Sequence, residues 1–425
     1  MYKFSKRRYL WASICVTSIL TSSLFSGELT LTKEAAVARA LEQNVALQAA
    51  QIIVSQAEAR LRQAGRLDNP ELHLRYGSDR AFNDEGERSM EVGFEQRFPV
   101  TNRLRVEQQI ARDEIEIARV GLENQTRLLV HAVETAYLRV AEIEAQLVLG
   151  DEILELYARF AKFVESRIDT GEASEIETNQ IKIERYAVMQ AKLRHANQLE
   201  LQQAELVQLL MLSDSERVKV TFDFGVPKQL PSLPVFNQSM LEAHPGYRAR
   251  RLLEHRADAR VDLVKANRWA DVAVEVFYEE ERGVDTPDGL GRDRFFGVGL
   301  SVPLPLFVNS TAAVQEQRLV SNQRAKELQA VTVEIQADVR LRRLQVQQFY
   351  KQAKVYDDSL MQLVTVNLEA MTQAYSAGQI ALADLFRSQE QGYNVRSAQL
   401  ELLHDYAQAI VDWESATAQQ GRNKE

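Results

Sequence analysis

Histidine is the side chain in this sequence best suited to bind a metal ion or to move a proton near neutral pH. The histidines show no His/Cys/Asp cluster at metal-ligand spacing; they lie at 73, 131, 195, 244, 255 and 404. The chain also lacks the phosphate-binding loop, the dinucleotide fingerprint and the nucleophile elbow that mark common enzymes. The sequence therefore predicts no enzymatic activity, no cofactor and no metal site.

The only cysteine, Cys15, lies in an N-terminal segment with the features of a secretory signal peptide. A basic stretch is followed by an apolar run at 9–20 and then by small residues, and the run is too short for a membrane-spanning helix. We place the signal peptide at 1–26, with cleavage between Ser23 and Gly27. Cys15 lacks the Leu-small-small context of a lipid-anchor site, so the mature chain would hold no cysteine and no disulfide.

The charge of the chain is acidic. It is −9 overall, and loss of the four basic residues among the first eight leaves about −13. Such a chain is a poor partner for nucleic acid. An acidic surface would suit cations, although acidic residues can equally serve only to keep a long helical array in solution.

Four segments alternate apolar and polar residues with the period of two that is typical of half-buried strands. Each segment is about ten residues long, the length of a tilted transmembrane strand. We expect strands at about 70–80, 89–99, 271–281 and 294–305.

The segments outside these strands predict long helices. From Val133 to Ile168, apolar residues step alternately by three and four, the period of a coiled-coil seam. From Asn309 to Ala377 there is neither proline nor glycine. One helix through that stretch would be roughly 100 Å long. A further helix is expected before each pair of strands, at about 30–66 and 239–268.

The same order of helix, two strands, long helix, turn and helix occurs twice in the chain. Gly93 and Gly299 are 206 positions apart, and Gly171 and Gly378 are 207 apart, which indicates an internal duplication. The expected division is a first repeat at 28–216, a linker at 217–238 and a second repeat at 239–421. Turns near 171 and 378 would reverse the two helix pairs.

Four membrane-type strands cannot close a barrel, which needs about eight, and open edges are not tolerated in lipid. The chain is therefore expected to pool its strands with copies of itself in a closed ring. Three copies would give a trimer with a 12-stranded β-barrel and a long α-helical tunnel below it. The fold class is mainly α with a transmembrane β part. By the alternation of its strand, His73 would face the barrel lumen.

Over nearly its whole mature length the chain resembles the TolC family of trimeric outer-membrane efflux channels. Two strand-end motifs look most like the heavy-metal branch of CzcC and CusC type: Ala64-Gly-Arg-Leu-Asp-Asn69-Pro70-Glu71-Leu72 and Val302-Pro-Leu-Pro-Leu-Phe307. The turn motifs 171–180 and 375–389 also match. The resemblance implies that the strands lie in the outer membrane in contact with its lipid. Most of the chain would lie in the periplasm below.

The resemblance also implies roles for the residues of the two turns. As periplasmic tips they would contact an adaptor protein through Gly171, Glu172, Ser174, Gly378, Gln379, Leu382 and Leu385. A tunnel gate would be formed by Asp384, Glu177 and Tyr375. An arginine of the family's gate is replaced here by Ile380, and an ordinary acid at a helix N-terminus would explain Asp384 and Glu177 equally well.

The function implied is that of an outer-membrane exit duct in a tripartite efflux system, joined to a periplasmic adaptor and an inner-membrane RND-type pump. Heavy-metal cations are the expected cargo, with drugs or secreted polypeptides as alternatives. A different class of function is an exported coiled-coil structural or tethering protein, which would be a water-soluble rod.

Overall fold

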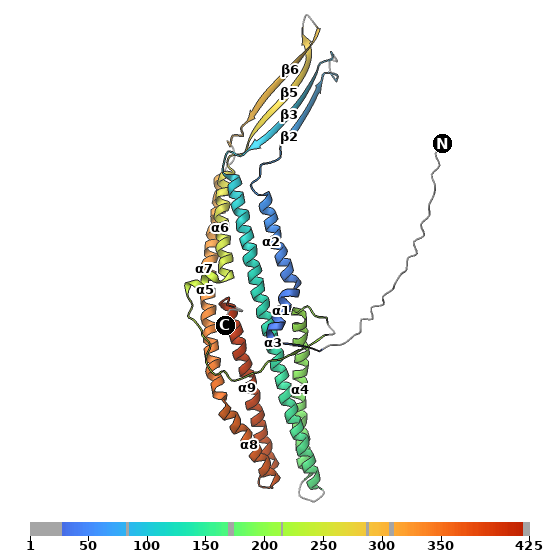
Figure 1. Ribbon diagram of the computed structural model, residues 1–425, viewed down its shortest axis with the longest axis vertical. Coiled ribbons are helices and arrows are strands. Elements are labelled where there is room, and N and C mark those ends of the chain that lie inside the picture. Colours follow the sequence, from blue (N-terminus) through green and yellow to red (C-terminus); the bar gives the residue numbers. More distant parts are fainter. Residues whose placement is uncertain are drawn as a thin grey trace, which may run out of the picture.

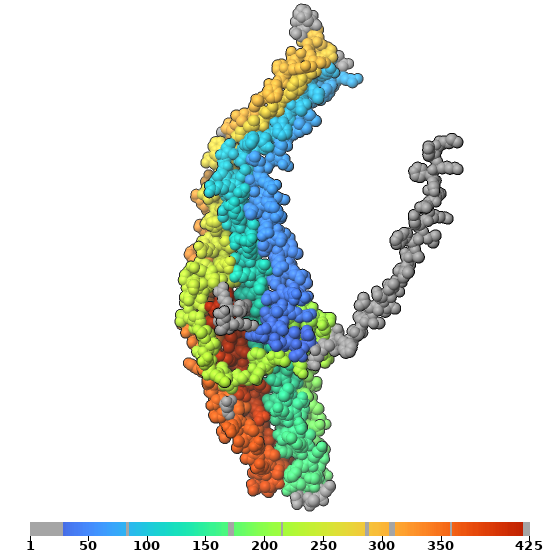
Figure 2. All heavy atoms as spheres, in the orientation of Figure 1, coloured from blue at the N-terminus to red at the C-terminus, as the bar shows by residue number. Residues whose placement is uncertain are grey.

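The computed structural model describes residues 28–81, 85–168, 174–213, 216–285, 289–305 and 310–419. The molecule is elongated, with a four-stranded sheet at one end and two helix pairs reaching the other (Figures 1 and 2). The expected signal peptide and the expected turn near 171 lie outside these residues.

The order of elements repeats along the chain. The first copy contains β1 (Glu28–Leu31), α1 (Lys33–Gln43), α2 (Val45–Gln63), β2 (Glu71–Ser78), β3 (Arg88–Phe98), α3 (Arg103–Ile168) and α4 (Glu175–Leu209). The second contains β4 (Arg217–Val220), α5 (Gln238–Ala243), α6 (Pro245–Ala266), β5 (Val272–Asp285), β6 (Gly289–Ser301), α7 (Ser310–Ala353), a 3-10 turn (Lys354–Tyr356), α8 (Asp358–Ser376) and α9 (Leu382–Ala416).

The helix ahead of each strand pair is broken once, which differs from the single helices expected at 30–66 and 239–268. Asn44 separates α1 from α2, and its Oδ1 accepts the Leu47 N–H at 3.0 Å. His244 separates α5 from α6, and its Nδ1 accepts the Gly246 N–H at 3.1 Å. Both side chains act as N-caps, so the break is a feature of the repeated unit.

The expectation of one helix from 309 to 377 is wrong. The helix α7 ends at Ala353, and α8 begins at Asp358 after a 3-10 turn. Asp357 causes the restart, because its Oδ1 accepts the Leu360 N–H at 3.0 Å and the Ser359 hydroxyl at 2.6 Å. A helix can therefore end without proline or glycine when a strong cap follows. The length of roughly 100 Å expected for that helix is instead found in α3, whose 66 residues span about 99 Å.

The central helix of the molecule is α3, which packs against α1, α2, α4, α6 and α9. Much of its expected seam is buried, including Val133, Val140, Ile143, Tyr157 and Val164. No helix in the described part of the chain is both long enough and apolar enough to span a bilayer.

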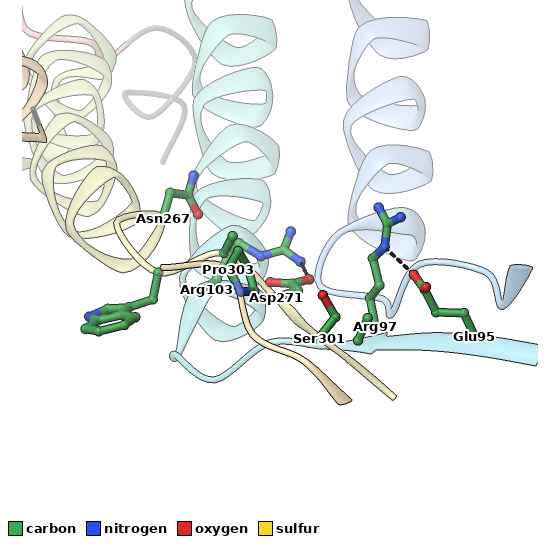
Figure 3. Close-up of a pocket in the computed structure, with 10 residues that line it drawn as sticks. Glu95, Arg97, Arg103, Asn267, Asp271, Ser301 and Pro303 are labelled. Atoms are coloured by element: carbon green, nitrogen blue, oxygen red, sulfur yellow. Dashed lines mark hydrogen bonds and ion pairs between the residues drawn. The ribbon is translucent and has the colours of Figure 1, made fainter. Parts of the chain in front are cut away.

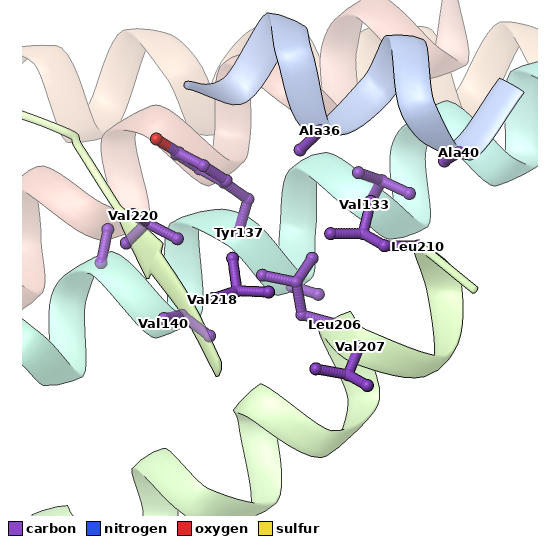
Figure 4. Packing of buried hydrophobic residues seen from close by; sticks show 12 residues of the cluster. Ala36, Ala40, Val133, Tyr137, Val140, Leu206, Val207, Leu210, Val218 and Val220 are labelled. Carbon is purple, nitrogen blue, oxygen red and sulfur yellow. The ribbon is translucent and has the colours of Figure 1, made fainter. Parts of the chain in front are cut away.

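The sequence pattern predicted a linker at 217–238, but β4 lies within it and pairs with β1 in a small parallel sheet. The Tyr137 hydroxyl of α3 lies between the two strands, 3.0 Å from the Leu31 carbonyl and 2.8 Å from the Thr221 carbonyl. Val218 of β4 packs with Leu206 and Tyr137 in the core that joins both strands to α1, α3 and α4 (Figure 4). Each strand has only four residues, too few for periodicity to reveal.

The larger sheet has the strand order β2-β3-β5-β6, with every neighbouring pair antiparallel. The strands lie close to where alternation placed them, but β5 extends four residues further, to Asp285, and β6 runs from Gly289 to Ser301, so it begins five residues before the expected 294. The hairpins of the two repeats thus meet along β3 and β5. In the described residues neither β2 nor β6 has a partner on its outer edge.

Candidate channel wall and helical tip

One face of the larger sheet is a continuous apolar surface. The register aligns Leu72, Phe94, Val276 and Val298 in one row across the four strands, and Leu74, Val92, Tyr278 and Phe296 in the next. Phe296 is 75% exposed and Leu74 71% exposed in the single chain. Large apolar residues left uncovered over a whole sheet face mark a surface that meets lipid or another protein.

The opposite face carries charged side chains and glycine. Glu71, Glu95 and Glu275 form one row, which ends at Gly299. The glycines leave space for larger neighbours: a Cβ at Gly93 would lie 2.8 Å from a Glu275 carboxylate oxygen. This alternation of an apolar face with a polar one is the pattern of a barrel wall between lipid and an aqueous lumen.

Opposite charges pair on the polar face. Arg75 of β2 binds both carboxylate oxygens of Glu91 on β3, at 2.7 and 2.8 Å. Arg97 joins two acids, with Nε 3.1 Å from Glu95 Oε1 and Nη2 3.4 Å from Glu71 Oε1.

One group on this face was not expected from the sequence. Glu71, His73 and Glu95 each offer a ligand atom, and these three atoms lie within 4.8 Å of one another. The sequence shows no His/Cys/Asp cluster at metal-ligand spacing, so it predicted no metal site. The Glu-x-His spacing on one strand was the available signal, since residues two apart share a face, but Glu95 joins only through the pairing of β2 with β3.

A polar hollow of about 570 Å³ lies where the sheet meets the helices (Figure 3). Arg103, at the start of α3, binds Asp271 beside β5 at 2.6 Å and Glu107 at 3.0 Å. Burial lowers the pKa of Arg103, but the charges of Asp271 and Glu107 outweigh it and raise the pKa above its usual value. This ion pair ties the two repeats together at the base of the sheet, and Glu95 and Arg97 line the same hollow.

The tip between α8 and α9 is a tight turn around Gly378. Its φ is +70°, its N–H donates to the Tyr375 carbonyl at 2.9 Å, and the Gln379 N–H donates to the Ala374 carbonyl at 2.9 Å. Gly378 and Gln379 are exposed, as is Ser174 at the start of α4. Gly171 and Glu172 lie outside the described residues.

Two expected adaptor contacts need correction, because the structure buries them. Leu382 is 2% exposed and Leu385 0% exposed. Both pack with Tyr375 and Tyr157 in the apolar core of the tip. They therefore fix the shape of the turn and offer no side-chain surface to a partner.

The three expected gate residues differ in their surroundings, and Glu177 lies close enough to Tyr375 for its charge to act on the Tyr375 hydroxyl. Tyr375 is buried against Phe163 at a ring distance of 5.9 Å, and burial, then the charge of Glu177, raises the pKa of its hydroxyl. Asp384 is about half exposed and pairs with Arg387 on its own helix at 3.4 Å. Ile380, which replaces the gate arginine, packs against the tip core.

Solved bacterial channels share the overall fold. CusC matches with a TM-score of 0.70 and 16% identity over 91% of both chains. The outer membrane protein VceC of Vibrio cholerae matches with 0.70 and 16% over 91% of this chain and 95% of that one. The MtrE outer membrane channel of Neisseria gonorrhoeae, in its open state, matches with 0.72 and 15% over 91% and 88%.

No curated protein matches the chain in sequence. Residues 36–210, which span most of the first repeat, match the outer membrane efflux protein family. The first repeat is therefore similar to the outer membrane efflux protein family. Members of this family are outer-membrane channels with a large periplasmic helical part and are not enzymes.

The family match and the shared fold favour an outer-membrane efflux channel over the water-soluble tethering rod.

Proposed function

We propose that three copies of this efflux-family chain form the exit duct of a tripartite system that releases heavy-metal cations outside the cell. An inner-membrane RND-type pump would deliver the cargo, and a periplasmic adaptor would join the pump to the helical end of the trimer.

The two-faced sheet with two free edges is the observation that carries this proposal. A single chain leaves β2 and β6 unpaired and leaves a wide apolar face uncovered among its described residues. Pairing β6 of one copy with β2 of the next satisfies both edges, and in a trimer it yields the closed barrel that lipid requires. The apolar rows then face lipid, and the carboxylates face the lumen.

The acidic polar face supports a cationic cargo. Glu71, Glu95 and Glu275 lie in one cross-strand row, so a trimer would place nine carboxylates at about the same height in the lumen. A ring of carboxylates concentrates cations and repels anions. The strand-end motifs shared with the CusC type point the same way, whereas organic drugs and secreted polypeptides need no such ring.

The adaptor would meet the exposed part of the tip. Among the described residues this part comprises Gly378, Gln379 and Ser174, which are exposed. The α8–α9 turn and the adjoining end of α4 lie at the same end of the molecule (Figure 1). Gly171 and Glu172 complete the proposed contact. Asp384, Glu177 and Tyr375 are proposed to narrow the closed tunnel just inside it.

A growth assay tests the cargo. A deletion strain, and the same strain carrying the intact gene, would be compared on zinc, cobalt, cadmium, copper and silver, and on dyes, detergents and antibiotics. We expect sensitivity to metals alone, restored by the gene. Sensitivity confined to the organic compounds, or no sensitivity to any of them, would reject metal cations as the cargo.

A further inference from the structure

The geometry points to a binding site for a borderline divalent cation, such as Zn²⁺ or Co²⁺, formed by Glu71, His73 and Glu95 on the polar face of the sheet. This inference goes beyond the proposed export function, because it concerns a metal ion bound by the sheet itself. It does not depend on which cargo the channel carries.

The three candidate ligand atoms converge on one point. His73 Nε2 lies 3.9 Å from Glu71 Oε2 and 3.9 Å from Glu95 Oε2. That nitrogen is screened from solvent and makes no hydrogen bond within the described residues. A shielded nitrogen that makes no hydrogen bond costs stability, and a cation between it and the two carboxylates would offset that cost.

Arg97 leaves the correct atoms free. It binds the Oε1 atoms of Glu95 and Glu71, at 3.1 and 3.4 Å, so each carboxylate turns its Oε2 toward the imidazole. An outer partner that fixes the orientation of ligating carboxylates is a regular part of metal sites. Arg97 therefore serves as a positioning residue, while the three convergent atoms form the inner set.

The surrounding charge also favours a cation. Glu275 continues the row of Glu71 and Glu95 on the next strand, and its carboxylate reaches across Gly93, the cross-strand partner of His73. Like charges side by side on neighbouring strands destabilise a sheet. Arg97 is the cation that the structure places against this row, and a divalent ion would offset much of the remaining repulsion.

The ligand set determines the class of metal. One imidazole nitrogen with two carboxylate oxygens suits Zn²⁺ and Co²⁺, whereas Ca²⁺ and Mg²⁺ prefer oxygen alone, and Cu⁺ and Ag⁺ prefer sulfur. Water would complete the coordination, because the described residues offer three ligands at this point.

The three ligand atoms need to move only slightly closer together to bind the ion. Ligand atoms about 2.1 Å from a tetrahedral metal lie about 3.4 Å apart, against the present limit of 4.8 Å. The side chain of Glu71 is 53% exposed and belongs to the edge strand β2, so it has room to move inward. Glu95 also lines the hollow at the base of the sheet, which gives an ion a path to the site.

Metal binding to the purified, full-length protein in detergent tests the inference. After removal of metals with a chelator, Zn²⁺ is titrated by calorimetry, and Co²⁺ is followed by its visible absorption. We expect one Zn²⁺ per chain, and at least a roughly tenfold loss of affinity in both His73→Ala and Glu95→Gln. His73→Gln serves if the alanine variant fails to assemble.

Two matched controls should keep the affinity of the unmodified protein. Glu279→Gln removes a carboxylate from the same strand face about 13 Å beyond Glu275, and His195→Ala removes a histidine from α4. Absence of stoichiometric binding, or binding that survives both His73→Ala and Glu95→Gln, would overturn the site. A strain insensitive to metals whose channel still binds Zn²⁺ would reject the cargo and keep the site.

Discussion

At the scale of single residues, Asn44 and His244 show how a duplicated unit can keep a geometry while changing its chemistry. Each accepts a backbone N–H at the start of the second helix of its pair. The amide of Asn44 does this at any pH. The Nδ1 of His244 can accept only while it carries no proton, so the cap of α6 depends on the neutral imidazole.

The structure holds His244 in the neutral form. Burial, and to a smaller extent the charge of Arg127, lowers its pKa from 6.5 to about 4 against the opposing effect of Asp338. A histidine whose pKa is lower in the folded state stabilises the fold fully above its unfolded pKa. This contribution is lost as the pH falls from about 6.5 to about 4.

The variant His244→Asn should therefore remove part of the acid sensitivity while keeping the cap. Between pH 7 and pH 4, its unfolding free energy should fall by about 2 kcal/mol less than that of the unmodified protein, after allowing for solvent screening. Chemical unfolding followed by circular dichroism at both pH values measures this. His244→Ala is the control, because it loses the cap as well, at a cost of about 1 kcal/mol at neutral pH. Equal pH dependence in His244→Asn and the unmodified protein would contradict the assignment.

At the scale of elements, the α8–α9 hairpin is held by a glycine turn outside and an apolar core inside. The left-handed backbone of Gly378 suits glycine, and asparagine tolerates it better than most residues. Tyr375, Leu382 and Leu385 close the core behind that turn. The shape that an adaptor would meet thus depends on residues that it cannot touch.

Replacement of Gly378 by proline should abolish efflux without preventing insertion, because a φ near −65° cannot form this turn. Trimer in the outer-membrane fraction and metal tolerance of the strain are the two measurements. Gly378→Asn is the matched control, expected to keep most activity. Normal efflux with Gly378→Pro would refute the adaptor contact.

Asp384→Ala separates the gate from the turn in the same hairpin. It leaves the turn intact and removes a carboxylate that would repel its copies in a trimer. Efflux should persist, while the resting conductance of the reconstituted channel rises. Unchanged conductance would exclude Asp384 from the gate.

At the scale of the whole molecule, the single chain is an incomplete wall. Its apolar sheet face and the outer edges of β2 and β6 have no partner within the described residues. Its helices extend from the base of the sheet, where the Arg103–Asp271 ion pair joins the repeats. Closure by symmetry explains the uncovered face and the free edges, since it pairs β6 of one copy with β2 of the next and turns the apolar face to lipid.

A charge on the apolar face should prevent assembly in the membrane. Leu74→Lys places an ammonium group among exposed apolar residues, which costs about 2–4 kcal/mol at the bilayer midplane. The amount of trimer in the outer-membrane fraction should fall. Glu279→Lys, on the polar face of the same sheet, should insert normally. Equal insertion of both variants would show that the apolar rows do not face lipid.

The sequence by itself determined the types and approximate positions of the main elements, although the breaks within the helices were not predicted. Alternation at Leu72, Leu74 and Tyr76 depends only on the strand period of two, and the seam from Val133 to Ile168 depends only on the helical period. Both signals are local and repeated, so they survive without knowledge of neighbours. The duplication was also visible, because it is a comparison of the chain with itself.

Only the tertiary structure decided which distant residues meet. The four-residue strands β1 and β4 become a sheet because the core around Tyr137 holds them together. The convergence of His73 with Glu95 exists only because β2 and β3 pair in one register, and a shift by one residue would place them on opposite faces. Contacts across strands depend on register and packing, and the spacing of residues along the chain does not contain that information.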